Sequence, residues 1–210
     1  MKNILIHGLG QNETSWNMVE KELNIHSMNV EKPNLYSMIK DTKIDYSTLY
    51  KKFAEYCNSF NEQLNLCGLS LGGILALDYA KEFLEKVNSL ILIGTPYQIP
   101  KYLFKLQGVI FHIMPKSTFE KIGCTKKDFM SLVSSMSDLD IGTNLDKIDC
   151  KTLILCGIKD NQNMENAKLL NENIKNSYFK TIGNASHEVN VDNPKELANI
   201  IYDFWREIQE

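Results

Sequence analysis

Three side chains in this sequence belong to the types that act together in nucleophilic catalysis: Ser70, Asp160 and His187. A serine hydroxyl is a weak nucleophile near neutral pH unless a neighbouring base takes its proton as it attacks. Histidine suits that task because its unperturbed pKa of roughly 6.5 lies near the working pH. A buried carboxylate fixes the histidine tautomer and stabilises the imidazolium that forms. These residue types therefore indicate acyl transfer, provided that the fold brings them together.

Ser70 lies in the segment GLSLGG, residues 68–73, between an apolar run and a stretch of helical periodicity. The spacing G-x-S-x-G predicts a strand, a tight turn and a helix, with the serine at the apex in a strained backbone conformation. The hydroxyl would lie at a helix N-terminus, where backbone N–H groups favour developing negative charge. Glycine and serine occur in many loops, so the motif alone also fits a simple helix N-cap.

Apolar periodicity predicts strands that alternate with helices along the chain. The predicted strands are residues 2–6, 28–30, 64–67, 87–93, 152–156 and 177–182. This order is typical of a mostly parallel six-stranded sheet with helices on both faces. The alternation breaks at residues 97–145, which we interpret as a short helical cap inserted within a single domain, residues 1–210, because it is too small to hold its own core.

The loops that follow four of these strands carry the candidate functional groups. Residues 7–10 follow the first strand, Ser70 the third, Asp160 the fifth and His187 the sixth. In parallel α/β sheets, functional groups gather beyond the carboxyl ends of the strands. The four loops should therefore meet at one edge of the sheet, and the order Ser, Asp, His is the one expected of an α/β-hydrolase.

Four motifs extend this into a resemblance to the α/β-hydrolase superfamily over nearly the whole chain outside residues 97–145. In this chain, the segment HGLGQNETSW resembles the family's oxyanion loop and GLSLGG resembles its nucleophile elbow. The segment LILCGIKD resembles the family's acid loop, and GNASHEVNVDNP resembles its histidine loop. The chain begins directly at the strand before the oxyanion loop, so it looks like a minimal member that lacks the first two antiparallel strands. The resemblance implies a compact serine esterase.

Carried over residue by residue, the resemblance implies a role for each motif residue. Ser70 is the nucleophile, His187 the general base and acid, and Asp160 the group that orients the imidazole. The backbone N–H groups of Leu9 and Leu71 form the oxyanion hole.

The cap gives less guidance, although it selects the substrate. Its apolar stripe either packs on the sheet or lines an acyl pocket, with Tyr102, Phe104 and Ile110 as the candidate lining residues.

Several other residues have competing interpretations. Only Asp160 directly follows a strand before the histidine loop, but four other aspartates are rivals for the role of the acid: Asp140, Asp146, Asp149 and Asp192. We expect His7 to hydrogen-bond loop backbone, Glu188 to be a solvated or loop-bracing carboxylate, and Cys67 to fill the core.

Composition limits the other classes of function. The 210 residues are 43% hydrophobic and carry a net charge of -3, with lysines scattered among acids, so we expect no nucleic-acid partner. No apolar run reaches membrane-spanning length, and no signal-peptide pattern follows Met1. Five cysteines without C-x-x-C spacing predict reduced thiols in a cytoplasmic protein, and four dispersed histidines predict neither a metal site nor a cofactor.

The leading hypothesis is a serine hydrolase that cleaves a small carboxylic ester or thioester, and we expect it to favour an apolar acyl group. The sequence makes no prediction of the oligomeric state. One alternative is a C–C hydrolase or a lyase such as a menaquinone-pathway synthase, which would need cations such as Lys101 or Lys105, because Arg206 is the only arginine. A second alternative is a ligand-binding protein that keeps the fold without hydrolysis.

Overall fold

The computed structural model describes residues 1–40, 42–98 and 115–208. Its centre is a five-stranded sheet in the order β1-β2-β3-β4-β5, in which all neighbouring strands are parallel. The strands are β1 (Lys2–Ile6), β2 (Leu64–Leu69), β3 (Val87–Ile93), β4 (Lys151–Gly157) and β5 (Ser177–Ile182). Five of the six predicted strands are therefore present, and the α/β class is confirmed.

The predicted strand at residues 28–30 is wrong. The chain there makes only one parallel bridge, between Ile4 and Glu31. Glu31 donates its N–H to the Asn3 carbonyl at 2.8 Å and accepts from the Leu5 N–H at 2.8 Å. The ladder cannot continue because Pro33, two residues later, has no N–H to donate. The segment therefore runs beside β1 without forming a sixth strand.

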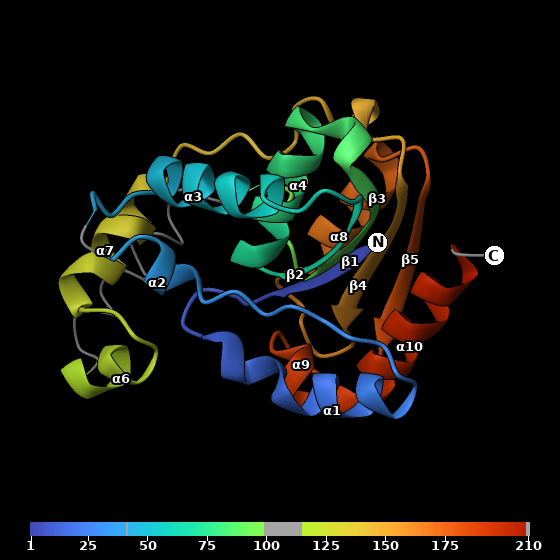
Figure 1. Cartoon of the computed structure of the whole chain (residues 1–210), viewed down its shortest axis with the longest axis horizontal. Coiled ribbons are helices and arrows are strands. Elements are labelled where there is room, and N and C mark those ends of the chain that lie inside the picture. The colour runs from blue at the N-terminus through green and yellow to red at the C-terminus, as the bar shows by residue number, and fades with distance from the viewer. Residues whose placement is uncertain (41, 99–114, 209–210) are drawn as a thin grey trace.

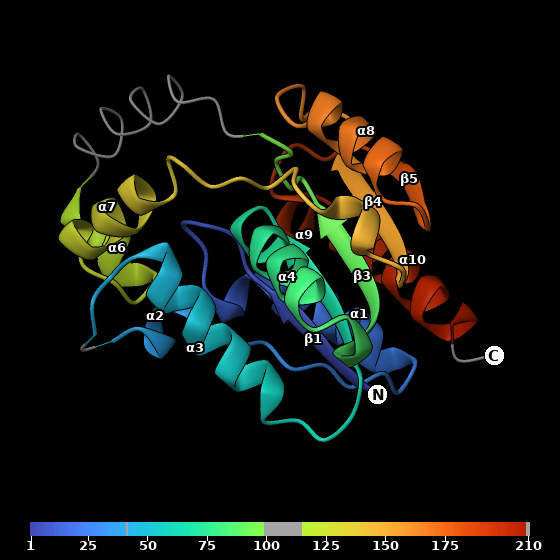
Figure 2. The ribbon, with the colours of Figure 1, turned by 90° about the horizontal axis from the view of Figure 1, so that it is seen from above.

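Helices cover both faces of the sheet, as Figures 1 and 2 show. The helices α1 (Asn17–Ile25) and α10 (Pro194–Glu207) pack together on one face. The helices α3 (Tyr46–Asn58), α4 (Leu71–Glu82) and α8 (Met164–Asn173) lie on the other. Shorter elements are η1 (Glu13–Trp16), α2 (Leu35–Met38), η2 (Leu84–Lys86), η3 (Leu145–Lys147) and α9 (Val189–Asp192).

Strand alternation divides the core into two apolar clusters, one on each face. In β1, Ile4 and Ile6 contribute to the cluster beneath α3 and α4, whereas Leu5 contributes to the cluster beneath α1 and α10. The inner strands β2, β3 and β4 are covered on both faces and are almost continuously apolar, whereas the outer strand β5 keeps exposed residues such as Tyr178 and Lys180. This burial holds the carboxyl ends of the strands at a fixed edge.

Side-chain hydrogen bonds mark the start of α10. Asn193 accepts a hydrogen bond from the Glu196 N–H at 3.4 Å, and Pro194 occupies the first turn. The Glu196 carboxylate binds the Asn193 side-chain amide at 2.6 Å and the Gly183 N–H at 3.4 Å, instead of the backbone N–H of Asn193. Glu196 thereby ties α10 to the histidine loop.

The described part of the predicted helical cap contains two short helices, α6 (Lys116–Lys121) and α7 (Lys126–Ser135). Phe119 and Phe129 pack edge to face at 5.0 Å and are buried in the same cluster as α3. Asn12, beyond β1, donates to the Lys121 carbonyl at 3.2 Å. The cap helices therefore lie against the domain on the side of the oxyanion loop.

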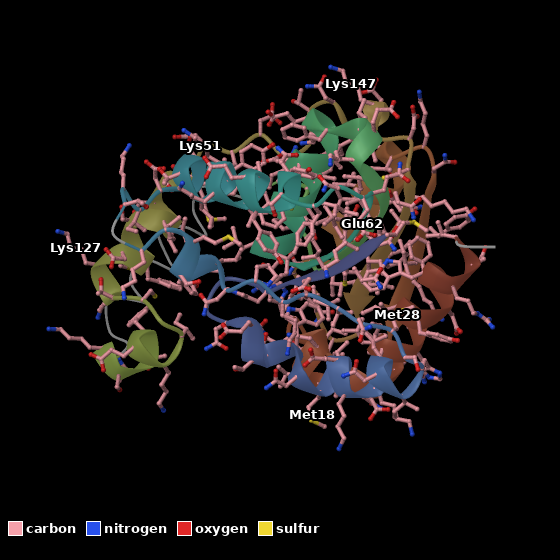
Figure 3. All side chains as sticks on the ribbon, viewed as in Figure 1. Met18, Met28, Lys51, Glu62, Lys127 and Lys147 are labelled. Atoms are coloured by element: carbon pink, nitrogen blue, oxygen red, sulfur yellow. The ribbon has the colours of Figure 1, made fainter. Side chains whose placement is uncertain are left out.

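The three lysines labelled in Figure 3 come from different elements. Lys51, Lys127 and Lys147 project from three separate regions of the molecule (Figure 3). Within the described ranges, no helix is both long and apolar enough to cross a membrane, and no three metal-ligating side chains cluster. All five cysteines are free thiols, three of them buried.

We predict that α10 is a major source of stability through Trp205, which is fully buried between the helix and the sheet. Trp205→Ala should lower the free energy of unfolding by about 3–5 kcal/mol, because it removes a large apolar side chain and leaves a cavity. Urea denaturation measures this loss. The neighbouring exposed Arg206→Ala is the control and should stay within about 0.5 kcal/mol of the wild type; an equal effect of both substitutions would contradict the prediction.

Candidate active site

The turn between β2 and α4 places Ser70 at its apex. Ser70 has φ 52° and ψ −110°, a positive-φ backbone conformation that residues other than glycine rarely adopt. Its N–H donates to the Ile93 carbonyl of β3 at 2.8 Å, and its carbonyl accepts from the Ile74 N–H at 3.0 Å. Its hydroxyl makes no side-chain cap to α4. The predicted strain is confirmed. Ser70 occupies the N-cap position of α4 through its backbone, but its side chain does not cap the helix.

The elbow requires glycines because neighbouring backbone and side-chain atoms leave no room for a Cβ at these positions. A Cβ at Gly68 would collide with the backbone of Gly72, and one at Gly72 would collide with the carbonyl oxygen of Ile6 in β1. A Cβ at Gly73 would collide with the hydroxyl of Thr95. The motif therefore lets α4 begin directly against the ends of β1 and β3, which keeps Ser70 at the edge of the sheet.

Asp160 and His187 form a hydrogen-bonded pair at the same edge. The Asp160 Oδ2 atom lies 2.8 Å from His187 Nδ1. The aspartate side chain is 5% exposed and the histidine side chain 40% exposed. The proton shared by the pair therefore belongs on Nδ1, which leaves Nε2, on the opposite side of the ring, as the acceptor.

The backbone explains why these two loops meet. They follow β4 and β5, which are neighbours in the sheet. Lys159 donates its N–H to the Ala185 carbonyl at 2.9 Å, and a Cβ at Gly157 would collide with the carbonyl oxygens of residues 185 and 186. The four rival aspartates make no hydrogen bond to His187: Asp140, Asp146, Asp149 and Asp192. Asp160 is the aspartate paired with the histidine.

The end of β3 connects the pair to the elbow. Ile93 accepts the Ser70 N–H, and the next residue, Gly94, lies directly beside the His187 ring. Gly94 has φ +51°, and a Cβ there would lie 3.1 Å from His187 Cε1 and 3.4 Å from Asp160 Oδ2. Any side chain at this position would press on the pair. Ser70 and His187 are therefore built around the same strand end.

Two backbone N–H groups next to the elbow have no partner. Leu71 begins α4 directly after Ser70, and Leu9 lies in the turn that follows β1. Neither N–H donates a hydrogen bond to any part of the chain that the structure describes. The neighbouring Gly10 N–H differs, because it donates to the Tyr36 hydroxyl at 3.0 Å.

His7 supports the oxyanion loop rather than the chemistry. Its Nδ1 lies 2.9 Å from the Gly8 carbonyl, and its Nε2 accepts the Leu35 N–H at 3.1 Å. Burial lowers the pKa of His7 to about 4, although the bond to Gly8 and the charge of Glu13 act in the opposite direction. His7 is therefore a neutral, buried structural histidine, as the sequence predicts.

The structure adds a residue that sequence reasoning missed, Asn163. Its side-chain Nδ2 lies 3.0 Å from Asp160 Oδ1, 2.9 Å from Asp160 Oδ2 and 3.1 Å from His187 Nδ1. Its backbone N–H also donates to Asp160 Oδ1 at 3.3 Å. The sequence signal for Asn163 is its position three residues after Asp160, in the turn before α8.

These donors decide the charge state of the acid. Burial alone would raise the pKa of Asp160, but hydrogen bonds from His187 and Asn163 outweigh it, and the pKa is held below the ordinary value of 3.8. Asp160 therefore stays a carboxylate at neutral pH.

The predicted pocket residues Tyr102, Phe104 and Ile110 lie outside the described residues. A cavity of about 570 Å³ lies in the described part of the cap, between the loop after α2 and the turn that joins α6 to α7. Its walls include Tyr36, Ile39, Ile44 and Cys124, and none of the predicted catalytic residues.

Comparisons with known proteins agree with this fold. No family model matches the chain. The human monoacylglycerol lipase ABHD6 is 25% identical over 96% of this chain and 74% of its own length. A thermophilic esterase from Thermogutta terrifontis superposes with a TM-score of 0.83 at 20% identity, covering 100% of this chain and 91% of its own. An esterase from Exiguobacterium antarcticum gives a TM-score of 0.79 at 18% identity, with 100% and 92% covered.

The contacts of Asn163 generate a prediction on pH dependence. A carboxylate whose folded pKa is lowered stabilises the fold above its unfolded pKa, and this stabilisation is lost as the pH falls through the folded pKa. Asn163→Ala removes side-chain donors, so the pKa of Asp160 should rise. The variant should lose about 1–3 kcal/mol of unfolding free energy at pH 7. Its difference from the wild type should shrink as the pH falls below 3.8.

Urea denaturation at several pH values makes the measurement. Asn161→Ala, in the same loop but exposed, is the matched control and should follow the wild-type curve. A difference between Asn163→Ala and the wild type that stays constant from pH 7 to pH 3 would contradict the assignment.

Proposed function

We propose that this chain, which belongs to the α/β-hydrolase superfamily, is a serine hydrolase that cleaves a small carboxylic ester or thioester through an acyl-enzyme intermediate. One observation carries the proposal: the hydrogen-bonded pair of Asp160 and His187 lies against the same strand end that holds the Ser70 backbone. This arrangement brings the candidate acid, base and nucleophile to one edge of the sheet, and their residue types and chain order support acyl transfer.

The proposed mechanism assigns one role to each group. His187 Nε2 takes the hydroxyl proton as Ser70 Oγ attacks the carbonyl carbon, and the carbonyl oxygen becomes the oxyanion. The intermediate collapses when the bond to the leaving alcohol or thiol breaks and the imidazolium returns its proton to that group. Water, activated by the same histidine, then releases the acid from Ser70. Asp160 holds the proton on Nδ1 and stabilises the imidazolium throughout.

The unpartnered N–H groups of Leu9 and Leu71 suit the oxyanion. One lies in the loop after β1 and the other at the first residue of α4, and neither donates to another described residue. A donor aimed at the developing charge is worth roughly 3–4 kcal/mol of barrier. The start of α4 adds the positive end of the helix dipole at the same place.

The relatives support the hydrolase class and give a direction for the substrate. Two structural neighbours are named as esterases, and ABHD6 is named as a monoacylglycerol lipase. All three names describe ester hydrolysis. Together with the apolar sequence of residues 102–114, they favour an ester whose acyl group is apolar and whose alcohol part is small.

The alternative reactions have less support. A lyase or C–C hydrolase acting on an anionic substrate would need cations near Ser70, but Lys101 and Lys105 lie outside the described residues. Arg206 lies on α10 and is 4.0 Å from Asp203, an exposed ion pair. A binding protein without activity would not need the Asp160–His187 pair or the Ser70 strain.

Ser70→Ala should lower kcat for short-chain p-nitrophenyl esters by roughly 10⁴- to 10⁶-fold, because it removes the attacking atom. His187→Gln should have a loss of similar size, since the proton acceptor is gone. Steady-state hydrolysis measures both effects, and a fluorophosphonate probe should label the wild type but not Ser70→Ala.

Ser186→Ala is the matched control, because this exposed serine lies beside His187 and only its backbone N–H is hydrogen-bonded. It should label and turn over like the wild type. Full activity of Ser70→Ala, or failure of the folded wild type to label, would exclude the proposed mechanism.

A second prediction concerns the acyl group. Across p-nitrophenyl esters from acetyl to octanoyl, kcat/KM should rise with chain length beyond acetate, because each methylene buried in an apolar pocket contributes about 0.8 kcal/mol. The rise should lie mainly in KM. Equal kcat/KM values across the series would contradict an apolar acyl site while leaving the Ser70 chemistry intact.

A further inference from the structure

A buried amide pair joins two loops that are far apart in the sheet. Gln11 lies two residues after Leu9, beyond β1, and Asn190 lies in α9, three residues after His187. The Gln11 Nε2 donates to Asn190 Oδ1 at 3.2 Å, and the Asn190 Nδ2 donates to Gln11 Oε1 at 3.2 Å. The two side chains thus form a reciprocal pair between residues separated by 179 positions.

Further hydrogen bonds complete the pair. Ser15 Oγ lies 3.1 Å from Gln11 Oε1 and 3.2 Å from Asn190 Nδ2. Gln11 Nε2 also donates to the Glu188 carboxylate at 3.0 Å, which makes Glu188 a loop-bracing residue. Gln11 is 6% exposed and Asn190 0% exposed. Because a buried amide is costly to leave unpaired, this network strongly favours one relative position of the two loops.

The sheet by itself does not set that position. β1 and β5 are the two outer strands of the described sheet, with three strands between them. At the usual spacing of neighbouring strands they lie about 19 Å apart. The loops after β1 and β5 therefore approach each other only by crossing beneath the ends of the inner strands, where α9 packs beside η1 and α1 (Figure 1).

This crossing matters for the chemistry because each loop carries one part of the proposed machinery. The β1 loop carries the Leu9 N–H, and the β5 loop carries His187. Both must be aligned with Ser70, which belongs to neither loop. A shift of about 1 Å between such groups can lower a rate by about 100-fold.

We propose that the Gln11–Asn190 pair is a positioning device that locks the oxyanion loop to the histidine loop, so that the Leu9 N–H and His187 stay aligned on Ser70. The inference rests on the proposed function, but the amide pair itself belongs to the fold. Gln11 and Asn190 act through Leu9 and His187 and are positioning residues, not catalytic ones.

Gln11→Glu and Asn190→Asp test the pair without changing side-chain size. Each replaces an amide N–H donor by a carboxylate oxygen, so that acceptors face each other across the pair. We expect kcat for a p-nitrophenyl ester to fall about 10- to 100-fold in each variant, with KM changed less than threefold, because alignment rather than substrate binding is lost. The transposed double variant Gln11→Asn/Asn190→Gln keeps two complementary amides and should recover a part of kcat over either acidic single variant.

Asn65→Asp is the matched control. Asn65 is equally buried, and its amide donates to Asn3 Oδ1 at 2.8 Å across β1 and β2, in the half of the sheet remote from Ser70. It should lower the urea midpoint like the other two variants but leave kcat within twofold of the wild type. Folded Gln11→Glu or Asn190→Asp with kcat within twofold of the wild type would overturn the proposal.

Two further measurements keep the outcome decisive. If neither acidic variant folds, Ser15→Ala removes only the hydroxyl that touches both amides. A kcat reduced severalfold supports the proposal, and an unchanged kcat overturns it.

Amide hydrogen exchange of residues 8–12 and 186–190 should be faster in the Gln11 or Asn190 variants than in Asn65→Asp, whatever the role of Ser70. Fast exchange with an inactive wild type would therefore mark a failure of the proposed function, whereas unchanged exchange would mark a failure of the amide pair.

Discussion

The structure depends on the close approach of β2 and α4 around Ser70. A serine with φ 52° lies in a region that costs about 1–3 kcal/mol for a residue with a side chain. The cost is tolerated because α4 is almost entirely buried against the sheet, where Leu75 and Leu77 are 0% exposed. The glycines at 68, 72 and 73 remove the atoms that would otherwise keep strand and helix apart. The glycine contacts and the buried helix α4 hold the half-buried apex serine at the edge of the sheet.

Parallel strands bring the remaining groups to that edge by two different routes. The acid and histidine loops follow neighbouring strands, and backbone hydrogen bonds between them make their contact a local consequence of the β4–β5 pairing. The oxyanion loop follows β1, at the opposite end of the sheet. Its relation to the histidine loop depends on side chains, because no strand pairing connects the two.

Two buried titratable groups at this edge, His7 and Asp160, are both hydrogen-bonded but differ in charge. His7 is neutral and bonded on both ring nitrogens, while Asp160 is charged and surrounded by donors. The same burial thus lowers the pKa of His7 and would raise that of Asp160, and only the hydrogen bonds to the carboxylate reverse the effect.

The sequence by itself determined the elements whose signals are local. Apolar runs predicted five strands, the G-x-S-x-G spacing predicted the elbow and its strain, and loop positions selected Asp160 and His187 before their contact was known. The prediction at residues 28–30 was wrong because a short apolar segment becomes a strand only if its partner's hydrogen bonds continue, and the ladder here stops after Glu31.

Only the tertiary structure decided which polar side chains meet. Gly94 beside His187 and the Gln11–Asn190 pair carry no pattern in the sequence, since asparagine, glutamine and glycine occur in most loops. The Asn163 amide on Asp160 is marked only by its position after the aspartate. A hydrogen bond between residues 179 positions apart depends on how loops cross after the sheet and helices have packed. Local periodicity reports burial, whereas pairing depends on three-dimensional distance, and that distance exists only in the folded chain.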